Sequence, residues 1–206
     1  MEKFNCLVLG WDDMSRLVDR ASESIMKSDF HPDVIVGISR GGLVPARLFC
    51  DNLMVKSCFS LKVDHWGLTA TKDGAAKLTH PLNKDLTGMR VLLVDDITDT
   101  GQSIQLARDH LITCNPKEVR TATLYNLVGS KFKPDFCGEE KEWSWMIFPW
   151  NFKEDMVNII KKINEGSDVS VDRIKSELKS GYGIDMDNSG IKNILGHIGY
   201  LAKVGK

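Results

Sequence analysis

Apolar residues along the chain follow two alternating patterns, one typical of buried strands and the other of amphipathic helices. A continuous apolar run of β-branched residues predicts a strand at 34–39, and further segments with the character of strands lie at 57–63, 90–96, 118–127 and 142–148. Apolar residues at helical spacing predict intervening helices at 11–28, 43–53 and 103–114. This alternation predicts an α/β domain with a largely parallel, twisted sheet flanked by helices.

The pattern changes after residue 152, where no further strand is predicted. Apolar residues at helical spacing form three successive stripes, at 156–163, 171–178 and 191–198. Ser170 and Ser189 precede the second and third stripes and are expected to cap those helices. We therefore predict two parts, an α/β domain over residues 1–152 and a small helical C-terminal extension over residues 153–206.

Composition narrows the class of protein. The 206 residues are 42% hydrophobic and 27% charged with a net charge of −1, which is typical of a soluble globular protein without a global attraction to nucleic acid or membrane. The five cysteines are scattered and never spaced as CxxC, which argues against a disulfide framework or a zinc site. Neither a transmembrane run nor a signal peptide is evident, so we expect a cytoplasmic protein.

The most informative loop follows the strand expected at 90–96 and reads DDITDTGQS. Asp95 and Asp96 are adjacent like charges, so they call for a ligand, a cation or open water. The next residues form a turn that opens a helix, where backbone N–H groups, the helix dipole and two hydroxyls suit a phosphate; they are Thr100, Gly101, Gln102 and Ser103. A plain turn with Asp99 as helix N-cap would explain Asp99 but not the aspartate pair. A Walker-type loop is rejected, because no lysine precedes the serine.

A second loop follows the strand expected at 34–39. It consists of Ser39, Arg40, Gly41 and Gly42. Ligands of doubly wound sheets bind beyond the carboxyl ends of the strands, where this loop and the aspartate loop both lie. The two glycines permit a close approach of the backbone. A simple strand-to-helix turn is the alternative explanation of this loop taken alone.

The aspartate loop resembles the 5-phosphoribosyl 1-pyrophosphate (PRPP) signature of type I phosphoribosyltransferases, with Thr98 replacing the usual aliphatic residue. The resemblance covers roughly residues 10–152 and implies that Asp95 and Asp96 hold the ribose hydroxyls near a Mg²⁺ ion carried by PRPP. It implies that residues 99–103 bind the 5′-phosphate and that Asp99 acts in catalysis, at N7 of the base. It also implies that residues 39–42 bind pyrophosphate around a cis Ser39–Arg40 peptide, and that residues 64–80 form a mobile flap.

The segment WSWMIFPW, Trp143–Trp150, resembles the hood of the bacterial xanthine-guanine and archaeal purine phosphoribosyltransferases. That resemblance implies that Trp145 stacks on the base and that the backbone of Met146 reads its edge; a core strand with structural tryptophans is the alternative. Relatives carry a base-binding lysine at the position of Leu127, which cannot donate a hydrogen bond. Lys131 and Lys133 are candidates to replace it, and the identity of the base stays open.

Together the resemblances imply a Mg²⁺-dependent enzyme of nucleotide salvage that joins a purine-like base to PRPP and releases pyrophosphate. We expect it to be a homodimer. The alternative is a PRPP-sensing regulator with the same fold and weak or no activity. Residues 151–206 carry nine Lys or Arg and eight Asp or Glu, a balance of +1, so a nucleic-acid-binding tail is not expected.

Overall fold

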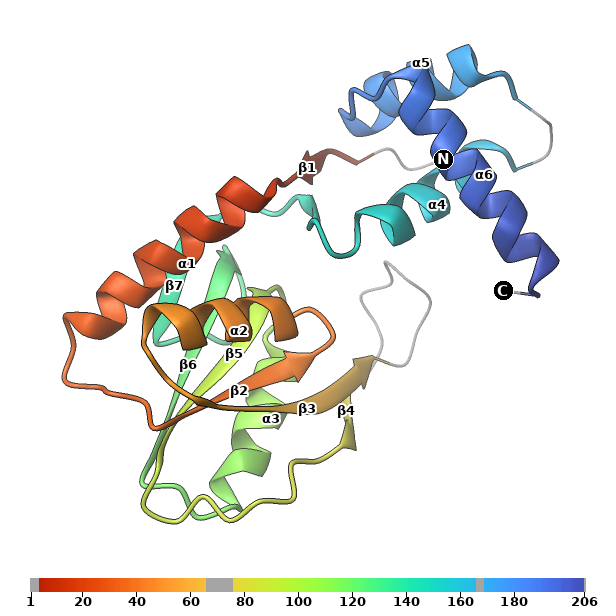
Figure 1. Cartoon of the computed structure of the whole chain (residues 1–206). Coiled ribbons are helices and arrows are strands. Elements are labelled where there is room, and N and C mark those ends of the chain that lie inside the picture. Colours follow the sequence, from red (N-terminus) through yellow and green to blue (C-terminus); the bar gives the residue numbers. More distant parts are fainter. Residues whose placement is uncertain (1–3, 66–75, 166–168, 206) are drawn as a thin grey trace. The chain divides into compact units, whose positions relative to one another are not determined.

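The computed structural model describes residues 4–65, 76–165 and 169–205 (Figure 1). Its contacts divide the chain into two compact units. Residues 12–143 form the first, here called the sheet unit. The residues up to Trp11 join those from Ser144 onward in the second, here called the helical unit. The boundary predicted near residue 152, between an α/β domain and a helical extension, is not tested by this division and stays a prediction.

A six-stranded sheet, counted over the described residues, organises the sheet unit in the order β4-β3-β2-β5-β6-β7. The strands are β2 (Val34–Ser39), β3 (Ser57–His65), β4 (Ala76–His80), β5 (Arg90–Thr98), β6 (Glu118–Leu127) and β7 (Phe136–Lys141). Neighbouring strands pair in parallel except β3 and β4, which are antiparallel. The predicted α/β fold with a largely parallel sheet is confirmed.

Helices cover both faces of this sheet (Figure 1). They are α1 (Trp11–Met26), α2 (Leu43–Asn52) and α3 (Gln102–Ile112). On β2, a Cβ added at Gly37 would lie 3.0 Å from Cβ of Ala46 in α2. The neighbouring Val36 instead belongs to a buried cluster with Ile104 and Leu111 of α3. Because successive side chains of a strand point to opposite faces, α2 and α3 lie on opposite sides of the sheet.

Three strands, β1 (Cys6–Val8), β4 and β7, were missed by the hydrophobic pattern, and one was misplaced. β4 lies within the loop expected at 64–80, whose residues 66–75 are outside the described part. β7 has the sequence FCGEEK, which is half polar because it is an edge strand. The strand expected at 142–148 is the shorter β8 (Trp145–Ile147), which pairs with β1 (Cys6–Val8) outside the main sheet.

The helical unit contains the β1–β8 pair and three helices. They are α4 (Phe152–Ile163), α5 (Val171–Tyr182) and α6 (Asn188–Lys203). The predicted stripes form its core, with Met156, Ile174 and Ile191 fully buried. Ser170 caps α5 as predicted, since its hydroxyl accepts from the Arg173 N–H.

The N-cap predicted for α6 at Ser189 is wrong. Asp187 takes that position, and its Oδ1 accepts a 2.7 Å hydrogen bond from the Gly190 N–H. Aspartate and serine are both good N-caps, so the residue type alone did not fix where the helix begins.

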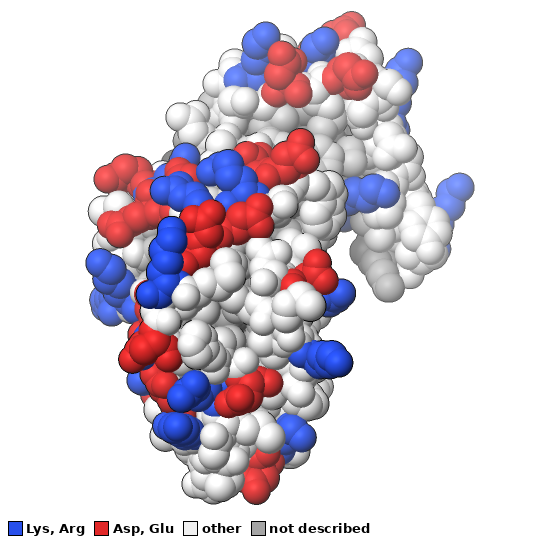
Figure 2. Space-filling model, turned by 60° about the vertical axis from the view of Figure 1, so that its left-hand side comes forward, with Lys and Arg blue, Asp and Glu red and all other residues white. Residues whose placement is uncertain are grey.

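Charged side chains of both signs are interspersed on the molecular face shown in Figure 2. Opposite-sign pairs occur on α1 and just after it: Arg16 pairs with Asp13, and Lys27 pairs with Glu23. None of the helices in the described part of the chain has the length and apolar character that crossing a membrane requires.

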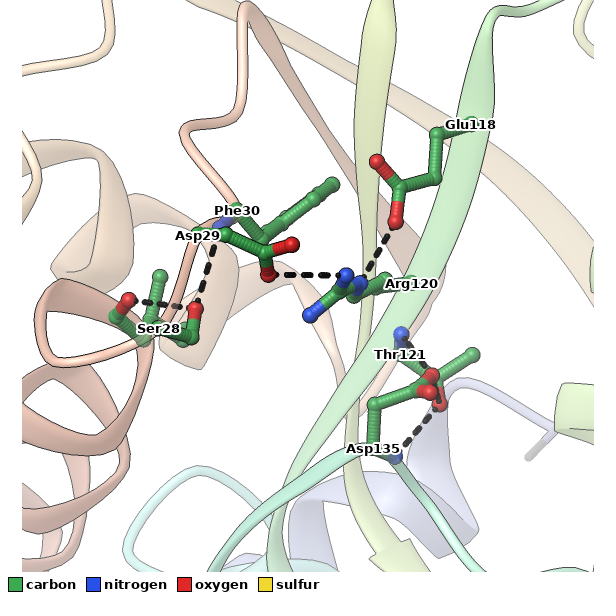
Figure 3. A network of polar contacts seen from close by, with 8 residues as sticks. Ser28, Asp29, Phe30, Glu118, Arg120, Thr121 and Asp135 are labelled. Atoms are coloured by element: carbon green, nitrogen blue, oxygen red, sulfur yellow. Dashed lines mark hydrogen bonds and ion pairs between the residues drawn. The ribbon is translucent and has the colours of Figure 1, made fainter.

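Arg120 of β6 joins three segments of the sheet unit (Figure 3). Its Nε donates to Glu118 at 2.6 Å and its Nη2 to Asp29, after α1, at 3.1 Å. The guanidinium carbon lies 5.1 Å from the ring centre of Phe30 and 6.0 Å from that of Phe136. The cation therefore lies near both rings, which are themselves stacked.

Replacing Arg120 by Met should lower the free energy of unfolding of the sheet unit by about 1 kcal/mol, because both ion pairs and the cation–π contacts are lost. Urea denaturation followed by circular dichroism measures this change. Arg47→Met is the matched control, since its 3.8 Å pair with Asp51 is largely exposed and should contribute little. Equal effects of the two substitutions would contradict this account of Arg120.

Candidate active site

The two loops singled out in the sequence meet at one edge of the sheet. They lie at the carboxyl ends of β2 and β5, which are parallel neighbours with Gly37 opposite Val94; β5 extends to Thr98 and includes Asp95 and Asp96. A side chain at Gly41 would collide with the carboxylate of Asp96. The structure thus brings the aspartate pair against the glycine loop, at the carboxyl edge where ligands bind in sheets of this type.

The first loop has the backbone that the resemblance implied. The Ser39–Arg40 peptide is cis, as expected. Gly42 donates its N–H to the Ile38 carbonyl at 2.9 Å. A Cβ on Gly42 would lie 2.5 Å from the Val94 carbonyl oxygen of β5, so no other residue fits without displacement. The loop backbone is therefore held tightly against β5, with Arg40 exposed beside it.

The aspartate pair is nearly buried, and its charges are close together. Asp95 and Asp96 are each only 9% exposed, and Asp95 Oδ1 accepts the Asp96 N–H at 3.0 Å. Burial raises the pKa of Asp95 well above its ordinary value, and the charge of Asp96 raises it further. This pair opposes stability, which is typical of residues retained for binding or catalysis.

The second half of the aspartate loop begins α3 without a side-chain cap. Gly101 is the N-cap residue, with φ of +83°, so Asp99 does not cap the helix. A side chain at Gly101 would also collide with Phe132. Asp99 and Thr100 are exposed, Ser103 is half-buried, and the Gln102 N–H donates to the Thr100 hydroxyl at 3.4 Å. The N-terminus of α3 thus offers the amide-rich environment that suits a phosphate.

Leu127 ends β6 and is 2% exposed, so its apolar side chain is buried. Beside it, Asn126 lies opposite Thr98 of β5. Asn126 Oδ1 and the Thr98 hydroxyl are buried and have no hydrogen-bond partner among the described residues. Sequence reasoning missed Asn126, although an amide near the end of a strand whose last seven residues are buried is a recognisable signal.

Two of the residues expected to contact the base, Trp145 and Met146, belong to the helical unit. Met146 of β8 is buried opposite Leu7 of β1. Trp145 is half-buried and its indole Nε1–H donates to Asp155 Oδ1 at 3.3 Å. Burial raises the pKa of Asp155 to about 6, although the bond from Trp145 lowers it. Sequence reasoning missed Asp155, which looked like one polar residue of an amphipathic helix.

Ion binding by protein side chains alone has no support in the residues described. No three His, Cys, Asp or Glu side chains in that part of the chain converge on one position. Asp95 and Asp96 nevertheless supply hard oxygen donors, and Mg²⁺ is commonly held by one or two carboxylates together with substrate phosphates. The donor set fits an ion that arrives with a phosphorylated ligand.

Asp95→Asn should raise the Tm at pH 7. The pKa of Asp95 is higher in the folded state than in the unfolded state, so the folded protein is favoured while Asp95 is protonated. This stabilisation is complete below the ordinary aspartate pKa and is lost as the pH rises toward the raised folded-state pKa. An amide removes the buried charge and can still accept the Asp96 N–H. Calorimetry between pH 4 and 8 should show a weaker decline for the variant.

Asp85→Asn is the control of opposite sign. The Thr87 hydroxyl, donating at 2.6 Å, lowers the pKa of Asp85, so its stabilisation is present at neutral pH and lost on acidification. This variant should melt at a lower temperature at pH 7. A fall in Tm for Asp95→Asn as well would refute the assigned strain at Asp95.

Comparison with known proteins agrees with this geometry. The phosphoribosyl transferase domain family matches residues 9–156. Xanthine-guanine phosphoribosyltransferase of Idiomarina loihiensis is 25% identical over 147 residues, covering 69% of this chain and 85% of that protein. Hypoxanthine-guanine phosphoribosyltransferase of Aquifex aeolicus is 29% identical over 143 residues, covering 65% and 79%. The crystal structure of a purine phosphoribosyltransferase from Pyrococcus horikoshii matches with a TM-score of 0.62 and 27% identity, covering 71% of this chain and 93% of that one. Since the family match spans most of the chain, this protein belongs to the phosphoribosyl transferase domain family.

Proposed function

We propose that this enzyme transfers the phosphoribosyl group of PRPP to a purine base and releases pyrophosphate, as a step of nucleotide salvage. The observation that carries the proposal is the contact of Gly41 with the carboxylate of Asp96, next to the cis Ser39–Arg40 peptide. It joins a loop suited to pyrophosphate to a loop suited to ribose and phosphate. The relatives reported above are named as purine transferases and none as a regulator, so the regulatory alternative gains no support.

Different groups of residues bind the ribose, the 5′-phosphate and the pyrophosphate of PRPP. Asp95 and Asp96 accept hydrogen bonds from the two ribose hydroxyls, which are donors that a carboxylate pair satisfies. Residues 99–103 bind the 5′-phosphate through backbone N–H groups and the hydroxyls of Thr100 and Ser103. Residues 39–42 bind the pyrophosphate, with Arg40 as the cation. A Mg²⁺ ion, when bound with PRPP near Asp95 and Asp96, neutralises pyrophosphate charge.

Asp99 is the residue to which the proposal gives a direct part in catalysis. It is exposed in the loop between the ribose-binding pair and the phosphate-binding turn. A carboxylate there can accept a hydrogen bond or proton from N7 of the base and stabilise positive charge that develops on the ribose. Its contribution is therefore made mainly in the transition state.

Base recognition combines Trp145, Met146 and Leu127. Trp145 stacks on the planar base, a contact that any purine allows, and the Met146 backbone reads the base edge. Leu127 offers no donor to an exocyclic 6-oxygen. A homodimer in the cytoplasm completes the proposal.

Asp99→Asn tests the proposed catalysis. With PRPP, Mg²⁺ and the best base of a purine panel, kcat and kcat/KM should both fall by about a hundredfold, because general acid–base groups typically contribute this much. The calorimetric Kd for PRPP should change less than threefold, and excess chelator should abolish turnover. Asp109→Asn, an exposed aspartate on α3, is the control and should retain wild-type rates. Full turnover by Asp99→Asn would show that the assigned role is wrong.

Leu127→Lys tests base selection. A buried 6-oxygen without a donor loses about 1–3 kcal/mol, so wild-type activity on hypoxanthine and guanine should be weak, and a lysine should raise kcat/KM at least tenfold. Leu127→Met is the control, since it conserves volume and adds no donor. Circular dichroism checks that both variants fold. Efficient wild-type turnover with no gain from lysine would mean that another group reads the base.

A further inference from the structure

Three acidic side chains are buried among the described residues, and two of them are the proposed ribose-binding pair. The third is Asp155 of α4, 6% exposed, in the helical unit. It lies among apolar residues, and the fully buried Met156 and Ile160 belong to the same helix. A carboxylate in such surroundings is destabilising unless something depends on it. The burial of Asp155 therefore calls for an explanation beyond packing.

The contact of Asp155 supplies that explanation. Its Oδ1 accepts the indole Nε1–H of Trp145 at 3.3 Å. An indole has this single polar atom, so one acceptor is enough to fix the rotation of the ring within its site. When Asp155 is ionised the bond is charge-assisted and therefore stronger than a neutral one.

Aromatic contacts restrain the same ring without replacing the hydrogen bond. The ring of Phe4 lies 5.8 Å from that of Trp145, tilted by 53°. Phe4 in turn meets Tyr182 of α5 edge-on at 5.3 Å. These contacts restrict where the indole lies, while Trp145 stays only half-buried. Part of the ring is therefore available for a ligand.

We infer that Asp155 is a positioning residue for base binding, which holds the Trp145 indole in the orientation that stacks on the purine. This inference rests on the proposed function, since it takes Trp145 as the stacking residue. It also gives the C-terminal extension a role, because α4 supplies the acceptor and α5 supports Phe4. The helical unit is then the support of the base-binding strand β8.

Fluorine NMR of the full-length protein labelled with 5-fluorotryptophan tests the contact without an activity assay. The Trp145 resonance is assigned by its absence in Trp145→Phe. It should shift between pH 5 and 8 with a midpoint near 6, following the raised pKa of Asp155. The shift should disappear in Asp155→Asn and persist in Glu154→Gln.

The same variants distinguish the titration of Asp155 from that of other titratable groups near Trp145. Burial raises the pKa of the Cys6 thiol to about 11, outside the range of the titration. Lys162, whose ammonium lies 5.9 Å from the Phe4 ring centre, is retained in Asp155→Asn. Glu154, which precedes Asp155 on α4, is also retained in Asp155→Asn, so a shift that survives in this variant would overturn the inference.

Steady-state kinetics tests the consequence for binding. Asp155→Leu should raise the KM for the base about tenfold, the effect of losing one hydrogen bond to a charged group, while the KM for PRPP changes less than twofold. Asp155→Asn, which keeps an acceptor, should restore most of the affinity, and Glu154→Leu should match wild type. Equal increases in both KM values would overturn the inference. A wild type inactive on every base would refute the proposed function, while the fluorine titration still decides whether Asp155 holds Trp145.

Discussion

The close approach of the β2 loop to β5 is the constraint on which the rest of the site depends. Gly42 leaves no room for a side chain against the Val94 carbonyl, and Gly41 leaves none against the Asp96 carboxylate. Parallel pairing of β2 with β5 sets the register at which these contacts occur. A loop suited to pyrophosphate and a carboxylate pair suited to ribose thereby become one site, although more than fifty residues separate Gly42 from Asp95 in the sequence.

Sequence patterns predicted the parts of the fold that depend on burial. The strands at 34–39 and 118–127 have the bounds expected: the first is an unbroken apolar run, and the second is buried over its last seven residues. The edge strands β4 and β7 were missed, since polar residues are tolerated where one side of a strand is unpaired. The Ser39–Arg40 cis peptide was expected only through the family resemblance. Asp155 was missed because its contact with Trp145, ten residues earlier, depends on how β8 and α4 pack together, which the helical pattern of α4 does not show.

The buried carboxylates show how stability and function are distributed in this chain. Burial raises the pKa of both Asp95 and Asp155, so both oppose folding at neutral pH. Arg120 and Asp135 instead stabilise the fold. They lie at the amino end of β6, where they join strands and turns through satisfied hydrogen bonds. Stabilising contacts thus gather at the amino end of the strand, and strained groups lie at the carboxyl end of the sheet and in α4.

The pairing of β1 with β8 has a consequence for the order in which the protein assembles during translation. The register that joins Cys6 to Trp145 unites the start of the chain with a segment that leaves the ribosome after every strand of the main sheet. The sheet unit can therefore fold around its own core while β1 still lacks a partner. β1 is thus among the last strands to find its partner, although it precedes the whole main sheet in the sequence.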